Sequence, residues 1–338
     1  MCRLNLGHYN KFRGDAVDVQ LKIQDNQTGV VYDASSLLIQ ATWSGEVTGQ
    51  PGRLEFELVR DGVLQFYEGS RIILQADGQD LFFGWVFSKS RKDNHTTKVI
   101  AYDQLRYLKN TDCYGFAQMT ASDIFAKICA DFQLRNHVVH SSQFVLPQKL
   151  YKDKTLANII QDSMQLTLIH TQKWYMIRDN FGTLEFLDMS QLKTDLLLGD
   201  ASLLLGYQYQ TSIDDDTYNQ VKLVKDNPDT GRRDVHLVLD SQTIDRWGLL
   251  QYYERVVETA NEAQIAQRAA QLMQQKNRVT RKLTLECLGD WRVMPGNGIW
   301  VETALDDMIL SRYMVVHGCS HTIKNKEHTM KVSLEVVE

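Results

Sequence analysis

Proline, cysteine and long apolar segments are scarce in this chain. Four prolines in 338 residues argue against long disordered linkers, so we expect the whole chain to be folded. The five cysteines lack a CxxC pair or a histidine at zinc-ligand spacing, which favours reduced, mostly buried thiols. No apolar run approaches a membrane span, and the first residues lack the apolar core of a signal peptide. We therefore expect synthesis and folding in the cytoplasm, without membrane binding.

Strong net charge is missing as well. The formal net charge of -5 comes from interspersed signs, which disfavours a basic DNA-binding surface, so DNA is expected only as passing cargo. The composition, 43% hydrophobic and 23% charged, is typical of a soluble globular protein. The length is sufficient for about two or three domains, each with its own core.

Sequence signatures of catalysis are also absent. The chain has no nucleophile elbow, P-loop, GxGxxG turn or HExxH helix, although a site assembled from distant residues would leave no such signature. Glu185 and Asp188, or Glu55 and Glu57, could be the carboxylate pair of a glycosidase. Alternation on exposed strand faces explains them without chemistry. We predict no catalytic residues and no cofactor.

Two acidic groups could hold a cation. The run Asp214–Asp216 lacks the alternating ligands and the glycine of an EF-hand loop, so a solvated acidic turn is the simpler interpretation. Asp226, Asp229 and Gly231 are residues that a hairpin tip requires in any case. Neither group predicts a metal site.

Three histidines, His317, His321 and His328, lie in one β-region and could form a metal cluster. Gly318 favours a turn or bulge that would separate the first two of them. We therefore predict no metal ligand here either.

Two stretches of the chain look like the same piece of β-sheet. Each runs from a glycine through an isoleucine to an aspartate with identical spacing, and then to a strand that begins with threonine. The first comprises Gly69–Leu74, Asp80–Phe83 and Thr96–Tyr102, and the second comprises Gly296–Val301, Asp307–Leu310 and Thr329–Glu335. A repeated β-unit without a catalytic motif is typical of assembly components that present two similar surfaces.

Residues 1–109 are expected to form an antiparallel β-domain. Apolar and polar residues alternate over Val17–Ile23 and Leu54–Leu58, which is the period of half-buried strands. Turn signals such as Pro51-Gly52 separate these runs at spacings that suit a sandwich or a barrel. About six or seven strands are expected.

Residues 110–205 are expected to form a small α+β domain. Its predicted elements are a helix after Thr120, a helix from Leu156 to about Gln165, and the strands Trp174–Arg178 and Thr183–Leu187. Thr120 followed by Asp123 is a typical helix N-cap. Gly182 supplies the positive φ that the hairpin between the two strands requires.

Residues 206–338 are expected to form a second β-domain with an inserted helix, 260–276. A hairpin is predicted from Asn219–Lys225 and Asp234–Leu239. Thr259 and Glu262 have the spacing of a capping box, and the apolar residues that follow them recur at helical spacing.

The chain resembles the tail hub proteins of PBSX-type defective prophages, the XkdQ/YqbQ family. The resemblance rests on segments that follow one another in order along nearly the whole chain. They are Ile39–Gly45, Gly52–Leu58, Phe83–Val86, Ile100–Asp103, Leu105–Leu108, Glu258–Gln264, Leu285–Asp290 and Pro295–Gly296.

This resemblance implies a structural hub of a contractile phage tail or tail-like particle. The fold it implies is α+β, mostly β, with two tube-like antiparallel β-barrels and the small α+β domain between them. Three chains would form a homotrimer that joins the six-fold tail tube to the three-fold central spike. Other baseplate proteins and the tape-measure protein are further possible partners. The chain would be located in the host cytoplasm during assembly and then in the baseplate of the virion or tail-like particle.

Four residues are predicted to lie at interfaces of this hub. Gln267 and Gln274 would present one side of the predicted helix to a neighbouring subunit or to the tube. Asp80 and Asp307 occupy matching positions in the two repeated segments. Two other functions stay open: a tail-associated cell-wall hydrolase, either peptidase or muramidase, and a spike component of an injection system. No hydrolase segment is recognisable, which disfavours the first.

Overall fold

The computed structural model describes residues 16–91, 95–227, 231–256, 261–305 and 309–335. The chain divides into two compact units: unit 1 comprises Met1–Tyr207 and Thr284–Glu335, and unit 2 comprises Gln208–Leu283. Most of the regular structure is strand, arranged in several sheets, which confirms the predicted mostly β, α+β class. None of the described helices is long and apolar enough to cross a membrane. The bounds 1–109, 110–205 and 206–338 stay a prediction.

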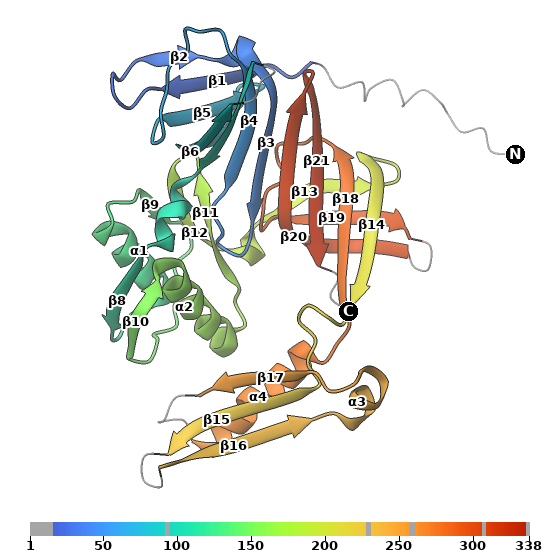
Figure 1. Ribbon diagram of the computed structural model, residues 1–338. Helices are drawn as coiled ribbons and strands as arrows, with labels where there is room; N and C mark the ends of the chain where they lie inside the picture. Colours follow the sequence, from blue (N-terminus) through green and yellow to red (C-terminus); the bar gives the residue numbers. More distant parts are fainter. Residues whose placement is uncertain (1–15, 92–94, 228–230, 257–260, 306–308, 336–338) are drawn as a thin grey trace, which may run out of the picture. The chain divides into compact units, whose positions relative to one another are not determined.

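Seven strands make up the first part of unit 1 (Figure 1). They are β1 (Val19–Gln24), β2 (Val31–Asp33), β3 (Leu38–Glu46), β4 (Arg53–Val59), β5 (Arg71–Ala76), β6 (Gln79–Arg91) and β7 (Thr96–Tyr102). Their burial alternates along each strand, and the inward side chains form one apolar core that includes Leu21, Phe56 and Ile72. The period-2 pattern of the sequence thus identifies the core face directly.

An α+β part follows a short 3-10 helix, Gln104–Lys109. Its elements are β8 (Thr111–Phe116), α1 (Ala121–Asp131), β9 (Asn136–Val138), β10 (Lys149–Thr155), α2 (Leu156–Thr171), β11 (Tyr175–Asn180) and β12 (Thr183–Asp188). The predicted N-cap Thr120 is confirmed and forms a capping box with Asp123, and Gly182 has φ +82° in the β11–β12 turn. Helix α2 is longer than predicted and ends at Thr171, and its C-cap Gln172 adopts the left-handed conformation.

Six more strands complete unit 1 or reach its border. They are β13 (Lys193–Gly199), β14 (Leu204–Ser212), β18 (Thr280–Leu288), β19 (Gly298–Ala304), β20 (Ile309–Lys324) and β21 (Glu327–Glu335). Together with the first strands they form a 13-stranded sheet in which β20 pairs with β3. Among the described residues this sheet follows an open path with β14 and β2 at its ends, so no closed barrel is found.

The two halves of this sheet have the same strand order. In the first repeat the order is β3-β4-β7-β6-β5-β1, and in the second repeat it is β14-β18-β21-β20-β19-β13. Chain order is conserved too, because each strand of the first repeat has its counterpart in the same place along the second. One difference in strand direction separates the repeats, since β1 is antiparallel to β5 whereas β13 is parallel to β19.

Backbone hydrogen bonds confirm the duplication residue by residue. Gly69 N donates to Val86 O at 2.7 Å, and Gly296 N donates to Val316 O at 2.8 Å. Each glycine has positive φ, +85° and +86°, before its strand begins. Val86 precedes a β-bulge in β6, and Val316 precedes the matching bulge in β20.

Ile72 and Ile299 therefore occupy equivalent, fully buried positions on β5 and β19. In the sequence, Asp80 and Asp307 lie at the same distance from Gly69 and Gly296. The strand pairs of the structure do not keep this correspondence. Phe83 pairs with Ile73, and Tyr313 is the residue that pairs with the equivalent Trp300, because the segment between β19 and β20 is longer than the β5–β6 turn. Asp307 itself lies outside the described residues.

Unit 2 begins within β14, ends within β18 and has its own small core. It contains β15 (Gln220–Asn227), β16 (Arg232–Leu239), α3 (Ser241–Trp247), β17 (Gln251–Arg255) and α4 (Glu262–Lys276). Strand β15 lies between β16 and β17, and α4 packs Ile265, Ala269 and Leu272 against this sheet. The predicted cap Thr259 lies outside the described residues. The described capping box uses Asn261 and Gln264.

Candidate interface between the two repeats

Strands β3 and β20 join the two repeats edge to edge. Antiparallel pairs run from Glu46 with Gly318 to Gln40 with Lys324, and Val47 N continues the ladder by donating to His317 O at 2.8 Å. On one face of this strand pair, the Thr42 and Thr322 hydroxyl oxygens lie 3.1 Å apart. Edge strands expose unpaired backbone groups, and this pairing satisfies one edge of each repeat with the other.

Two histidines and two tryptophans pack over this seam. His321 stacks on Trp43 with ring centroids 5.2 Å apart, and Trp291 stacks on His328. His321 Nε2 lies 2.8 Å from Val293 O, and His321 Nδ1 lies 2.9 Å from His328 Nε2. Because a carbonyl oxygen only accepts, His321 carries its proton on Nε2, and His328 donates to its Nδ1.

Both histidines are held in the neutral form. Burial lowers the pKa of His321 to about 4. Burial, and next the neighbouring His321, lower the pKa of His328 to about 3. Desolvation disfavours the charged form of a base, so this pair acts as part of the core at neutral pH. In the described part of the chain, no group of three or more His, Cys, Asp or Glu side chains could hold a metal ion.

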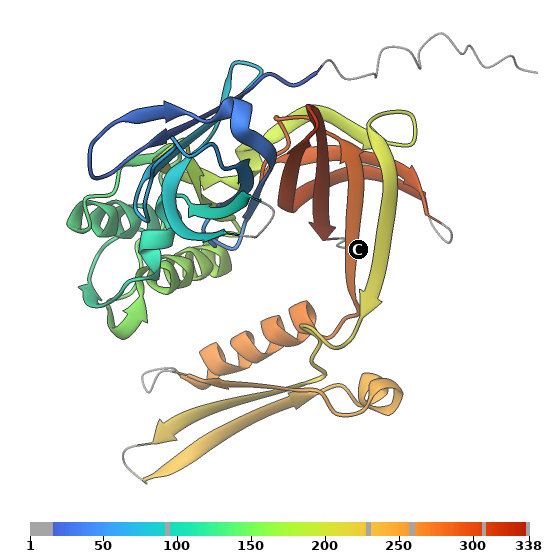
Figure 2. The same ribbon diagram turned by 45° about the horizontal axis from the view of Figure 1, so that its top comes forward.

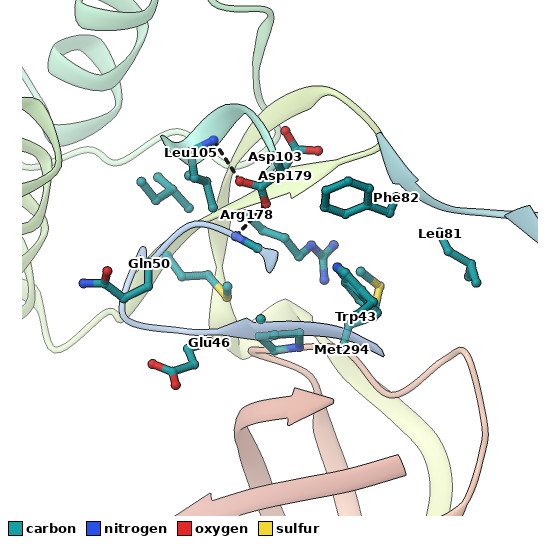
Figure 3. Close-up of a pocket in the computed structure, with 15 residues that line it drawn as sticks. Trp43, Glu46, Gln50, Leu81, Phe82, Asp103, Leu105, Arg178, Asp179 and Met294 are labelled. Atoms are coloured by element: carbon teal, nitrogen blue, oxygen red, sulfur yellow. Dashed lines mark hydrogen bonds between the residues drawn. The ribbon is translucent and has the colours of Figure 1, made fainter. Parts of the chain in front are cut away.

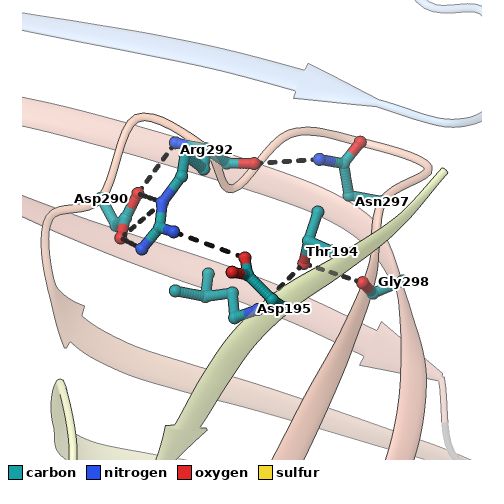
Figure 4. Close-up of polar contacts among 7 residues, drawn as sticks. Thr194, Asp195, Asp290, Arg292, Asn297 and Gly298 are labelled. Atoms are coloured by element: carbon teal, nitrogen blue, oxygen red, sulfur yellow. Dashed lines mark hydrogen bonds and ion pairs between the residues drawn. The ribbon is translucent and has the colours of Figure 1, made fainter.

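The loop between β18 and β19, which carries Trp291 and Val293, is fixed by polar contacts (Figure 4). Arg292 binds the carboxylate of Asp290 at 2.7 Å and reaches Asp195 of β13 at 3.5 Å. Asn297 Nδ2 donates to Arg292 O at 2.9 Å. Trp291 Nε1 donates to Asp77 of the first repeat at 3.1 Å. The loop therefore connects both repeats through side chains as well as through the β3–β20 ladder.

A pocket between β3, the 3-10 helix and β11 contains two carboxyl groups, Asp103 and Asp179 (Figure 3). Asp103 accepts from Gly52 N at 2.8 Å and from Leu105 N at 3.0 Å. Asp179 accepts from Gly182 N at 2.7 Å and from Gln104 N at 3.3 Å. Each carboxyl oxygen thus already holds a backbone donor, and the pair connects the first repeat to the β11–β12 hairpin.

Their pKa values are shifted upward. Burial, and next the charge of Asp179, raise the pKa of Asp103 well above its usual value. Burial raises the pKa of Asp179 to about 6. Paired carboxyls with raised pKa values are also found in hydrolases. Here their oxygens accept from turn and helix backbone groups, which is the pattern of a structural junction.

Three of the acidic residues that the sequence analysis considered have charged partners, and Asp229 lies outside the described residues. Asp215 and Asp216 form ion pairs with Lys282 and Lys276 within unit 2. Asp226 contacts Arg233 and Arg255 across the β16-β15-β17 sheet. These contacts agree with the interpretation of acidic turns and hairpin ends.

The carboxylate pairs that could suggest a glycosidase are likewise paired within their sheets. Glu185 lies 3.4 Å from Arg178, and Asp188 caps a short 3-10 helix through Ser190 N. Glu55 contacts Arg53 on its own strand, β4, and Lys98 on the neighbouring strand β7.

The predicted interface residues are exposed but are not brought to one place. Gln267 and Gln274 share the exposed face of α4 in unit 2. Asp80 lies at the start of β6 in unit 1 and accepts from Gln75. Their role at an interface stays a prediction, and Asp307 is not among the described residues. The β3–β20 seam was missed by sequence reasoning. No local sequence signal locates it, because β3 and β20 are far apart along the chain.

Comparison with known proteins identifies the family. The YQBQ-like family model matches residues 41–335. The Bacillus subtilis (strain 168) phage-like element PBSX protein XkdQ is 30% identical over 275 residues, which cover 80% of this chain and 82% of XkdQ. The uncharacterized protein YqbQ of the same strain is 29% identical over 289 residues, covering 83% of this chain and 86% of YqbQ.

Solved structures share the fold. The 43 kDa tail protein of prophage MuSo2 from Shewanella oneidensis has a TM-score of 0.70 at 13% identity, covering 93% of this chain and 98% of that one. An E. coli component of the type VI secretion system has a TM-score of 0.54 at 11% identity, covering 94% of this chain and 77% of that one. The family match and the relatives agree with the sequence resemblance: this chain belongs to the YqbQ-like family, together with XkdQ of the PBSX element.

Proposed function

We propose that this chain is the structural hub of a contractile phage tail or tail-like particle, where a homotrimer joins the six-fold tail tube to the three-fold central spike. The observation that carries the proposal is the duplication of a six-strand order within one chain, with the two repeats paired edge to edge through β3 and β20. A ring of three such chains presents six similar units on one face. A symmetry change from six to three is what a hub between tube and spike requires.

In this proposal each repeat is the core of a tube-like barrel domain. The first barrel corresponds to residues 1–109, the α+β domain to 110–205, and the second barrel to 206–338, with unit 2 inserted into it. Registers that match across the two repeats support two domains of one design. Names of relatives and similar structures, a phage-like element protein and a prophage tail protein, point to the same setting.

The partners follow from this position. The chain would bind itself, the tail tube protein, the spike and other baseplate proteins, and the tape-measure protein could contact the ring. DNA would only pass through. Assembly would take place in the host cytoplasm, after which the chain would remain in the baseplate of the particle.

Imaging of an assembled tail end tests the proposal most directly. We expect density at the junction of tube and spike into which three copies of unit 1 fit as a ring. Sedimentation of the purified chain provides a second test, for which we expect a trimer. A strict dimer or tetramer would contradict the hub.

The predicted interface residues of α4 can be tested in the same particles. Gln267 and Gln274 are exposed on one face of the helix, and a buried, unpaired charge at an interface is costly. We expect Gln267→Glu or Gln274→Glu to impair particle assembly while the isolated chain stays folded. Glu262→Gln at the start of the same helix serves as the control. Normal assembly of both glutamate variants would remove α4 from the interface.

An injection-system spike is the second candidate, because the fold is shared with the E. coli type VI component. Neighbouring genes discriminate between the two, since terminase and capsid genes accompany a phage tail. A hydrolase has no observation in its favour among the described residues. A zymogram on cell wall with the isolated chain is expected to show no clearing, and clearing would contradict a purely structural role.

A further inference from the structure

The β3–β20 seam pairs an edge of the first repeat with an edge of the second repeat. Each of these two edges has a counterpart in the other repeat. Strand β3 corresponds to β14, and β20 corresponds to β6. Strand β14 is the end of the sheet and, in the described part of the chain, pairs only with β18 (Figure 2). The question is whether β6 offers the counterpart of the β20 edge.

The registers place Ser88–Arg91 of β6 at the position of Gly318–His321 of β20. In both strands the segment follows the matching bulge and remains paired with the next strand, β7 or β21. Side-chain contacts agree: Lys89 Nζ donates to Phe66 O, and Cys319 Sγ lies 3.5 Å from Val293 O. Lys89 and Cys319 are therefore equivalent.

The two segments, Ser88–Arg91 and Gly318–His321, differ in burial. Gly318, Cys319 and His321 are buried where β3 covers them, whereas Ser88, Ser90 and Arg91 are exposed. Beyond Trp85 no strand of the described chain pairs with this side of β6. The first repeat thus has the same edge as the second, without the strand that covers it.

Strand β14, the counterpart of the covering strand β3, pairs with β18 and, among the described residues, with no other strand. On β3, Ala41 and Trp43 are buried in the seam, whereas on β14 Leu205 is 62% exposed and Tyr207 is 40% exposed. Exposed apolar side chains on an edge strand mark a surface built for pairing.

We propose that the free edge of β14 in one chain pairs with the Ser88–Arg91 edge of β6 in a second copy of this chain, repeating between chains the pairing that β3 and β20 make within one chain. Each chain supplies one edge of each kind, so the contact is heterologous and propagates around a ring. The partner is a second copy because this chain already pairs the equivalent two edges, β3 and β20, within itself. The inference rests on the proposed hub, and it names the surfaces that hold the ring together.

Disulfide trapping in the full chain tests this pairing. In a background with Cys2 and Cys113 replaced by serine, one tagged chain carries Ser90→Cys and a second, differently tagged chain carries Gln208→Cys or Gln210→Cys. Directly opposed strand residues lie within disulfide reach. We expect cross-links that contain one chain of each tag. A single chain that carries both cysteines should give a ladder that ends at the ring size.

Two controls make the result decisive. Ser44 and Ser320 face each other in the seam, so S44C with S320C should form a disulfide within one chain. Lys127, exposed on α1, should give no cross-link with S90C when changed to cysteine. If the seam control forms and neither β14 position traps Ser90→Cys, the pairing is wrong. The hub proposal would survive that outcome if imaging still places three chains at the tail end.

Discussion

At the scale of single residues, the buried pair of His321 and His328 gives the fold a measurable pH dependence. Their folded pKa values, about 4 and about 3, lie below the usual value of 6.5. Between these values the unfolded chain binds protons that the folded chain excludes, so stability rises with pH there and levels off above about 6.5. The slope per histidine is at most about 1.4 kcal/mol per pH unit.

We expect His328→Gln to reduce this slope, because glutamine can still donate to His321 Nδ1 but does not titrate. Urea unfolding midpoints measured between pH 4.5 and 7 check the prediction. His137→Gln, at an exposed position on β9, is the matched control and should leave the slope unchanged. Equal slopes in the wild type and in His328→Gln would mean that the pair is not buried neutral.

Asp103 and Asp179 have the opposite effect on stability over part of the same pH range. A raised carboxyl pKa, about 6 for Asp179, means that the folded chain keeps a proton that the unfolded chain has lost. This contribution to stability is present below about pH 4 and is lost as pH rises through about 6. We therefore expect Asp179→Asn to steepen the rise of stability with pH between about pH 4 and 6. Asp80→Asn, at an exposed position, should not.

At the scale of elements, the glycines that precede β5 and β19 test the duplication energetically. Gly296 has φ +86°, and a Cβ there would lie 2.1 Å from Met176 Sδ. Gly69 has φ +85°, and a Cβ there would meet only the end of the Asn26 side chain at 2.8 Å. Gly78, at φ +75° with open space around it, isolates the backbone cost.

We expect Gly78→Ala to cost about 1 kcal/mol through its backbone conformation alone. Gly69→Ala should cost somewhat more, and Gly296→Ala the most, because a packed core must also move. Urea unfolding of the three variants gives the order. A cost at Gly296 no larger than at Gly78 would contradict the close approach to Met176.

Sequence patterns predicted the positions of strands and helices better than they predicted which strands pair. Period 2 located the strands of the first repeat, and Thr120 with Asp123 located a helix start, because these signals depend on local hydrogen bonds and on which face is buried. The pairing of β3 with β20 joins residues far apart along the chain and leaves no local signal. The interpretation of Gly318 as a turn or bulge was right only as a bulge, and β20 continues through it, which is why His321 reaches His328.

At the scale of the whole molecule, unit 2 occupies a place where the first repeat has a short connection. Strands β3 and β4 are joined by residues 47–52, whereas their counterparts β14 and β18 are separated by unit 2. Unit 2 has a separate core of Val221, Leu223 and the apolar face of α4. A separately cored insertion between neighbouring strands should be dispensable for the fold that hosts it.

We therefore expect a chain in which residues 213–279 are replaced by a second copy of residues 47–52 to fold. It should keep the near-ultraviolet signal of the Trp43, His321 and Trp291 cluster, and its urea m-value should fall because less surface is exposed on unfolding. The deletion leaves the β14 and β6 edges in place, so its oligomeric state by sedimentation should match that of the full chain. Loss of the oligomer with the fold intact would place the subunit contact on unit 2, on the α4 face with Gln267 and Gln274. Loss of the aromatic signal would show that β14 and β18 need unit 2 to hold their register.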